Sequence, residues 1–190
     1  MEHQKVLNQI RGRQNNAQGW IFEDAILMAC ERYRQQGRAD VDKTPEPFRV
    51  TQKHQNGLFT GRFTARAMPD FEGTLQGGRN IIFEAKYTTT DRIKRNMLTE
   101  KQMEKLALRH KMGADALVVF GIGQRFYTVP WYIWNNMKNI YGRQYLTPAD
   151  IECYRIKFTG AVLFLDYVHP QEYRTKIIFG AKMEGLHNEQ

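Results

Sequence analysis

Two acidic residues and a lysine in the first half of the chain have the types and spacing for chemistry on a phosphate ester. Residues 82–87 read Ile-Phe-Glu-Ala-Lys-Tyr, which predicts a strand with Glu84 and Lys86 on one face, because side chains alternate along a strand. Phe83 and Ala85 then face apolar packing on the other side. A carboxylate and an ammonium beside an apolar run are costly unless they are paired or bind something.

The third residue is Asp70, which a predicted hairpin brings close to this strand. Residues 76–78, Gln-Gly-Gly, supply the turn. If all three form the loop, Asp70 lies opposite Glu84. If the two glycines alone form it, Asp70 lies opposite Ala85. The sequence leaves both registers open, and either one places Asp70 within about one residue pair of Glu84.

Two carboxylates at such short range repel each other, and a divalent cation resolves that conflict. Carboxylate oxygens with open positions suit Mg²⁺ or Mn²⁺, whose remaining sites take water and phosphate. Such a metal polarises a phosphodiester, and Lys86 is placed to hold the attacking water or to stabilise charge on phosphorus. The trio therefore favours phosphodiester hydrolysis. The alternative is a surface carboxylate beside an ordinary Glu–Lys salt bridge.

The elements around these residues predict a mixed α/β fold. Periodicity predicts a helix over residues 19–36, and a capping box at Thr99 opens a second helix that runs to about Met112. The apolar run 81–83 predicts a central strand buried on both faces. The other predicted elements are strands at 117–122, 126–129 and 161–168, a short helix at 131–140 and a helix start at Thr147. A mixed central sheet flanked by helices accommodates this order.

Two segments are predicted to lie outside the core. Residues 1–16 are polar, so we expect a flexible basic arm from which Arg11 and Arg13 reach a phosphate backbone. Residues 46–66 predict a projecting hairpin around an Asn-Gly turn, because the segment is only half apolar. The hairpin is basic through Lys53, His54, Arg62 and Arg66.

Composition limits the function classes. Lys and Arg number 28 against 20 for Asp and Glu, which gives a net charge of +8 and favours an anionic partner, most often nucleic acid. The 190 residues favour one domain over 1–190. The longest apolar runs are far too short to span a bilayer, so no membrane role is expected. Cys30 and Cys153 lack a paired spacing, which predicts reduced thiols in the cytoplasm.

The pattern Asp70…Glu84-Ala85-Lys86 resembles the PD-(D/E)xK nuclease motif, and Pro69 supplies even its first letter. More closely, the chain resembles the RecU-type Holliday junction resolvases of Gram-positive bacteria and their phages. The similarity covers about residues 15–135 in order. It is carried by the stretches 19–23, 45–47, 69–73 and 83–88 and by Gln102.

The resemblance implies a restriction-endonuclease-like core and a role for each residue of the motif. Asp70 and Glu84 would be metal ligands, and Lys86 would be the catalytic lysine. Glu23 would bind a second metal or a water at the edge of the site, with a solvated helix carboxylate as the alternative. Gln102 would help to orient the site, unless it only completes the capping box.

The resemblance also implies a substrate and an assembly. RecU-type resolvases are homodimers that act on four-way DNA junctions, since two symmetric nicks need two sites related by a two-fold axis. The hairpin 46–66 would be the stalk that enters the junction, although it is short for this family. Thr88 would touch phosphate, unless it is an ordinary strand residue. Trp131 and Trp134 are candidates for the dimer surface or for the core.

The sequence therefore predicts a Mg²⁺- or Mn²⁺-dependent endodeoxyribonuclease that resolves Holliday junctions by paired phosphodiester hydrolysis in recombination and repair. Two alternatives stay open. The short stalk favours a restriction-like or DNA-processing endonuclease acting on duplex or forked DNA. A non-catalytic DNA-bridging protein, in which the carboxylates are structural, is the other.

Overall fold

The computed structural model describes residues 2–45, 47–63 and 68–169, and of residues 2–16 and Phe63 it describes the backbone alone. A five-stranded mixed sheet forms its centre, with the strand order β1-β4-β5-β7-β8. The strands β5 and β7 are parallel, and the other neighbours are antiparallel. The five strands are β1 (Ala39–Lys43), β4 (Phe71–Leu75), β5 (Asn80–Thr88), β7 (Asp115–Ile122) and β8 (Arg125–Pro130). The predicted mixed sheet and its central strand are confirmed.

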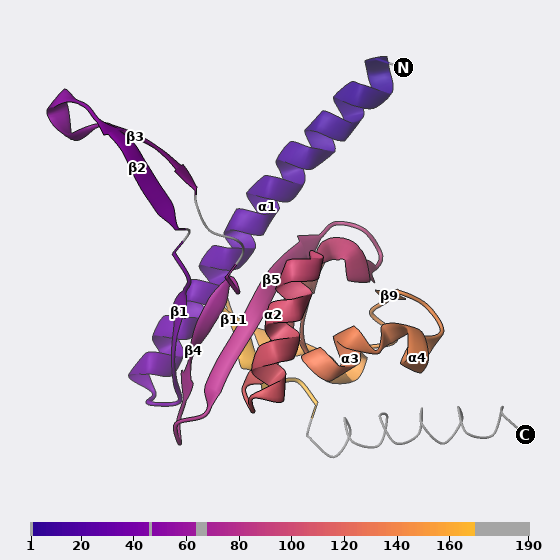
Figure 1. Cartoon of the computed structure of the whole chain (residues 1–190). Helices are drawn as coiled ribbons and strands as arrows, with labels where there is room; N and C mark the ends of the chain where they lie inside the picture. Colours follow the sequence, from indigo (N-terminus) through magenta and orange to yellow (C-terminus); the bar gives the residue numbers. More distant parts are fainter. Residues whose placement is uncertain (1, 46, 64–67, 170–190) are drawn as a thin grey trace, which may run out of the picture.

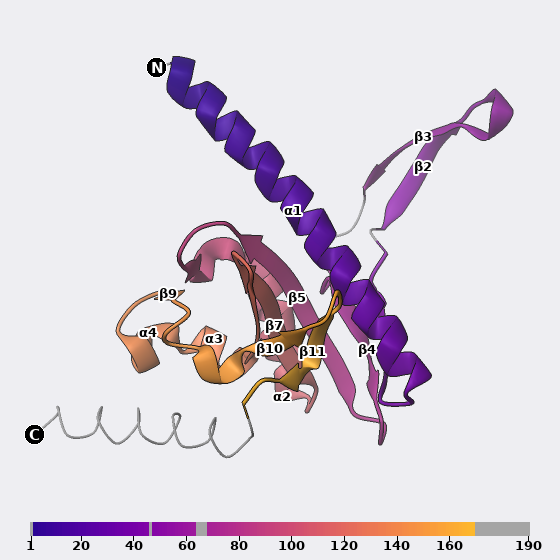
Figure 2. The same ribbon diagram turned by 180° about the vertical axis from the view of Figure 1, so that it is seen from behind.

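Helices cover both faces of the sheet (Figures 1 and 2). Helix α1 (Glu2–Gln35) packs on one face, and α2 (Glu100–Lys111) packs on the other with the short helices α3 (Trp131–Asn135) and α4 (Met137–Tyr141). Successive residues of β5 contribute to two separate cores. Ile81 and Phe83 belong to the core under α1, and Ile82 belongs to the core under α2. This alternation fixes which side chains share the face of Glu84.

Helix α1 begins much earlier than the sequence analysis predicts. Residues 2–16 were expected to form an arm without regular structure, but their backbone continues the helix without a break. The reason is local, because this stretch contains no proline and only one glycine, Gly12. The amino-terminal part of α1 extends beyond the sheet (Figures 1 and 2).

The strands β2 (Phe48–Lys53) and β3 (Phe59–Phe63) form a separate two-stranded sheet that projects from the body (Figure 1). Their connection contains the 3-10 turn η1 (Gln55–Gly57), in which Asn56 and Gly57 have φ values of 68° and 77°. These left-handed conformations are what an Asn-Gly pair supplies at low cost. The hairpin that the sequence predicts is therefore present.

The remaining described elements lie on both faces of the sheet. On the α2 face are β6 (Ile93–Lys94) with β9 (Tyr145–Leu146) and the 3-10 turns η2 (Arg95–Met97) and η3 (Glu152–Tyr154). On the α1 face, β10 (Ile156–Phe158) pairs with β11 (Val162–Tyr167). The helix predicted to start at Thr147 is wrong. Asp150 accepts hydrogen bonds from the backbone and hydroxyl of Thr147 and from Arg143, and this closes a turn instead.

The two tryptophans considered for the dimer surface lie in the core. Trp131 is 4% exposed and Trp134 is fully buried. The core interpretation is thus confirmed for both, because they pack with Phe120 and Tyr127 under α2. No helix in the described ranges is long and apolar enough to cross a membrane.

Candidate active site

The register of β4 against β5 places Asp70 at the end of the hairpin, opposite Glu84. Phe71 pairs with Phe83 and Thr74 pairs with Asn80, so residues 76–78 all belong to the loop. Of the two registers left open by the sequence, the three-residue loop is the one that forms. The backbone N–H of Ala85 donates to Asp70 Oδ2 at 2.9 Å and fixes that carboxylate.

Lys86 lies between the two carboxylates. Its Nζ donates to Asp70 Oδ2 at 3.0 Å and to Glu84 Oε2 at 3.1 Å. Glu84 is fully buried, and the side chains of Lys86 and Asp70 are 19% and 26% exposed. The alternation of side chains along β5 therefore brings the predicted acid–acid–lysine set together.

Gln102 reaches the same cluster from the first turn of α2. It is the third residue of the helix and completes a capping box with Thr99. Its Nε2 also donates to Glu84 Oε2 in a short hydrogen bond. Gln102 thus caps α2 and also contacts Glu84, and its role in orienting the site stays a prediction.

The charges of Asp70, Glu84 and Lys86 favour the binding of a further cation. Burial raises the pKa of Glu84 to about 8, and the neighbouring Asp70 carboxylate adds to the shift. Burial alone would lower the pKa of Lys86, but the charges of Asp70 and Glu84 outweigh it and raise that pKa. Lys86 therefore stays an ammonium. The Glu84 carboxyl group is costly to ionise beside Asp70 unless a further positive charge binds there.

The donor set suits a hard divalent metal. Glu84 Oε1 is buried and has no hydrogen-bond partner among the described residues. A buried carboxylate oxygen in that state is costly, and a cation would satisfy it. Within the described part of the chain, no group of three or more His, Cys, Asp or Glu residues converges. A metal here would take Asp70 and Glu84 plus water and phosphate, a common arrangement for Mg²⁺.

A family model described as Recombination protein U, RecU, matches residues 17–171. The chain belongs to the RecU family. This match confirms the resemblance and the predicted class of function, a DNA endonuclease that resolves Holliday junctions. A solved structure that is similar is Hjc, a Holliday junction resolvase from Archaeoglobus fulgidus, an archaeal hyperthermophile. The two are 15% identical with a TM-score of 0.39, over 61% of this chain and 75% of that one. No curated protein matches the chain.

Of the three acidic residues predicted to bind metal, Glu23 pairs with a different lysine from the one that Asp70 and Glu84 share. Its Oε2 forms an ion pair with Lys43 Nζ at 2.5 Å. Lys43 pairs with Phe71 across β1 and β4, one residue from Asp70. This ion pair joins α1 to β1, and the role of Glu23 toward a second metal stays a prediction.

The residues predicted to bind DNA are only partly described. Lys53, His54 and Arg62 are exposed on the projecting hairpin. Arg66 lies outside the described residues, as do the side chains of Arg11 and Arg13. Thr88 is nearly buried at the end of β5. Its hydroxyl shares a 2.8 Å hydrogen bond with the hydroxyl of Thr90 and accepts from the Thr90 backbone. These bonds hold the turn after β5, and a contact of Thr88 with phosphate stays a prediction.

The sequence did not indicate one group of the site, the backbone N–H of Ala85. It carries no side-chain signal, and only the register of the hairpin could have pointed to it.

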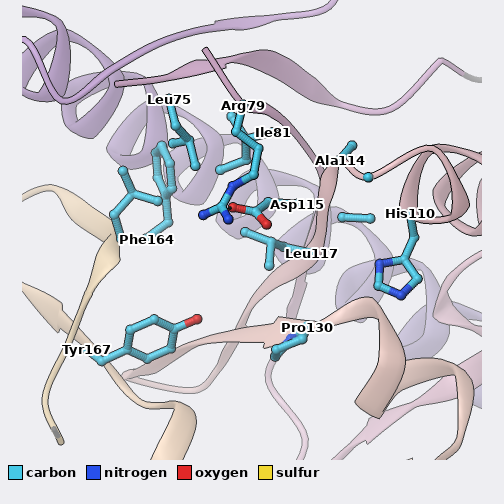
Figure 3. A pocket seen from close by; sticks show the side chains of 13 residues that line it. Leu75, Arg79, Ile81, His110, Ala114, Asp115, Leu117, Pro130, Phe164 and Tyr167 are labelled. Atoms are coloured by element: carbon cyan, nitrogen blue, oxygen red, sulfur yellow. Dashed lines mark ion pairs between the residues drawn. The ribbon is translucent and has the colours of Figure 1, made fainter. Parts of the chain in front are cut away.

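A separate pocket of about 500 Å³ lies at the other end of the parallel strands (Figure 3). It is bounded by Ile81 and Asp115, which begin the paired stretch of β5 and β7, and by an ion pair of 2.9 Å between Arg79 and Asp115. None of the predicted site residues lines it. Its lining is mainly apolar and includes Leu75, Leu117, Pro130, Phe164 and Tyr167.

Proposed function

We propose that this RecU-family chain hydrolyses phosphodiester bonds of four-way DNA junctions in a reaction that requires Mg²⁺ or Mn²⁺. The observation that carries the proposal is the cluster at the carboxyl half of β5. Asp70 and Glu84 converge there on one lysine, and a buried Glu84 oxygen accepts no hydrogen bond from the described residues.

Asp70 and Glu84 would hold the cation. The chemistry that a bound cation supplies is polarisation of the scissile phosphate and a lower pKa for the attacking water. Asp70 is oriented for this by the Ala85 backbone, and Glu84 is oriented by Gln102. Fixed ligands of this kind cost little reorganisation during the reaction.

Lys86 would act on the reacting phosphate. Its ammonium keeps its proton because two carboxylates lie within 3.1 Å of Nζ. With a cation held by those carboxylates, the Lys86 N–H groups would be free to donate to the attacking water or to a phosphate oxygen. This donor would stabilise the charge that develops on phosphorus.

The hairpin β2–β3 would select the junction. It projects from the body and exposes Leu58 and Phe59, by 69% and 56%, beside the cations Lys53 and Arg62. Apolar side chains can wedge between bases while cations contact phosphates. A duplex or forked-DNA endonuclease is the alternative if this short hairpin gives no preference for junctions.

We further propose a homodimer, because one four-way junction presents two symmetric cleavage positions. Trp131 and Trp134 are excluded as its surface, since both are buried. We place the contact between copies on α1, where Trp20, Ile21 and Met28 are 72%, 60% and 62% exposed along a stripe about 100° wide. A solution mass of one 22.3 kDa chain at assay concentration would contradict the dimer.

A cytoplasmic location stays a proposal. It is supported by the two cysteines, which are buried in different cores on opposite faces of the sheet and so form no disulfide with each other.

Metal binding and cleavage in matched variants test the site. Asp70→Asn and Glu84→Gln should each lose Mn²⁺ binding in calorimetry and lose junction cleavage. Glu72→Gln is the matched control, because Glu72 lies on β4 two residues from Asp70 and pairs with Arg109 on α2 instead. The control should bind and cleave as the unmodified protein does. Cleavage that survives both active-site substitutions would overturn the assignment.

A further inference from the structure

Thr99, at the N-cap of α2, is linked to the metal-binding carboxylate through one side chain. Its hydroxyl oxygen accepts from the backbone N–H of Gln102 at 3.3 Å. In return, Gln102 Oε1 accepts from the Thr99 backbone N–H at 3.0 Å and from the Thr99 hydroxyl at 3.1 Å. Two donors of one residue therefore hold the carbonyl end of the Gln102 amide.

This arrangement fixes which end of the amide meets Glu84. A glutamine amide has an acceptor oxygen and a donor nitrogen. With Oε1 held by Thr99, Nε2 is left to donate to Glu84 Oε2. If the amide were reversed, its N–H groups would face the N–H of Thr99 and its oxygen would face the Glu84 carboxylate. Both contacts would be repulsive.

The consequence appears in the two oxygens of Glu84. Oε2 accepts from Gln102 Nε2 and from Lys86 Nζ, whereas Oε1 has no donor among the described residues. Protein donors thus occupy one oxygen and leave the other for a cation. A neighbour that orients a ligand in this way commonly changes metal affinity by about 10- to 100-fold when it is removed.

We propose that Thr99 is a positioning residue of the active site, which acts through Gln102 to keep Glu84 Oε1 available to the metal. The inference rests on the proposed function, because it assumes that Glu84 binds the cation. It differs from the ordinary role of Thr99, which is to cap α2.

Three substitutions at position 99 separate positioning from capping. Thr99→Ser keeps the cap and the hydroxyl donor. Thr99→Ala loses both. Thr99→Asp keeps the cap, because aspartate is a good N-cap acceptor, but it has no hydroxyl proton to donate to Gln102 Oε1. Its added negative charge would by itself attract a cation, so weaker metal binding by Thr99→Asp has the opposite sign to a charge effect.

The measurements are Mn²⁺ affinity by calorimetry, thermal stability, and junction binding and cleavage. We expect Thr99→Asp to melt close to the unmodified protein, to bind Mn²⁺ about 10-fold more weakly and to lose kcat with junction affinity retained. Thr99→Ser should match the unmodified protein in every measurement. Thr99→Ala should lose both stability and Mn²⁺ affinity.

The outcomes are distinct. Unchanged or tighter Mn²⁺ binding by Thr99→Asp would overturn the positioning role and leave Thr99 as a cap, while the proposed function would stand. An unmodified protein that neither binds Mn²⁺ nor cleaves junctions would overturn the proposed function, and the role of Thr99 with it.

Discussion

The two oxygens of the Glu84 carboxylate differ in their surroundings, since two protein donors bind Oε2 and no described residue donates a hydrogen bond to Oε1. Burial makes this side chain expensive to ionise, and Lys86 only partly offsets that cost. The same ammonium competes with a metal for both carboxylates. Lys86 should therefore weaken metal binding while it promotes hydrolysis, and the two effects can be measured separately.

Lys86→Met tests this separation. Removing the ammonium takes away a positive charge 3.0 to 3.1 Å from both carboxylates, so Mn²⁺ should bind at least as tightly as in the unmodified protein. Cleavage should fall by about 100-fold or more, because a donor that stabilises the transition state is lost. Calorimetry and single-turnover cleavage measure the two quantities. Lys94→Met, at an exposed cation on β6, is the control.

A different pair of results would contradict this role. If Lys86→Met lost Mn²⁺ binding along with cleavage, Lys86 would be holding the carboxylates in place and would have no separate part in the chemistry.

At the scale of the elements, some features followed from local signals and others depended on distant contacts. The capping box at Thr99 and the Asn-Gly turn at Asn56 and Gly57 are short-range signals, and the elements that they predict are present. The apolar run of residues 81–83 likewise predicted the central strand.

What the sequence left open has physical reasons. Gly77 and Gly78 both have positive φ values, and two flexible residues permit either loop length. Packing of Phe71 against Phe83 on the α1 face, with ring centroids 4.9 Å apart, accompanies the register that forms. At Thr147 the sequence predicts a helix that does not form. Instead, Arg143 binds the carboxylate of Asp150, a residue that would have lain in the first turn of that helix.

A partly buried polar network links α1 to β11. The Tyr33 hydroxyl donates to Asp166 Oδ2 at 2.9 Å and accepts from the Leu165 backbone at 3.1 Å. Arg38 donates to both oxygens of Asp166. Burial alone would raise the pKa of Asp166, but the bonds from Arg38 and Tyr33 hold it below its usual value.

Asp166→Asn should cost about 1 kcal/mol of unfolding free energy near pH 7, because charge-assisted bonds are lost. A carboxyl group with a lowered folded-state pKa contributes stability above its unfolded pKa, about 3.9, and loses it as pH falls through the folded value. The difference between the unmodified protein and the variant should therefore shrink below about pH 4. Urea unfolding at pH 7 and pH 3 measures it. An equal difference at both pH values would contradict the assignment.

At the scale of the whole molecule, the cleavage site and the projecting hairpin are separate structures. The cluster lies in the central sheet, while β2–β3 forms its own sheet away from the body (Figure 1). Cleavage chemistry and the choice of substrate should therefore respond to different substitutions.

Changes at the exposed tip test this division. Leu58→Ser with Phe59→Ser should lower the preference for four-way junction over linear duplex by about 10-fold, because stacking or wedging side chains are lost. Mn²⁺ affinity should stay unchanged. Met112→Ser, at another exposed apolar residue, is the control. Competition binding of labelled junction and duplex gives the ratio, and an unchanged ratio would show that the hairpin does not select junctions.

Cleavage of a labelled four-way junction beside the matching linear duplex tests most directly whether this protein is a metal-dependent junction nuclease. Reactions contain Mg²⁺, Mn²⁺ or a chelator, with Lys86→Met in parallel. We predict paired nicks in the junction that require the metal and disappear in the variant, while the duplex stays intact. Equal cleavage of junction and duplex would favour an endonuclease without junction selectivity. Tight junction binding with no cleavage in either metal would contradict a nuclease function and leave Asp70, Glu84 and Lys86 as structural residues of the sheet.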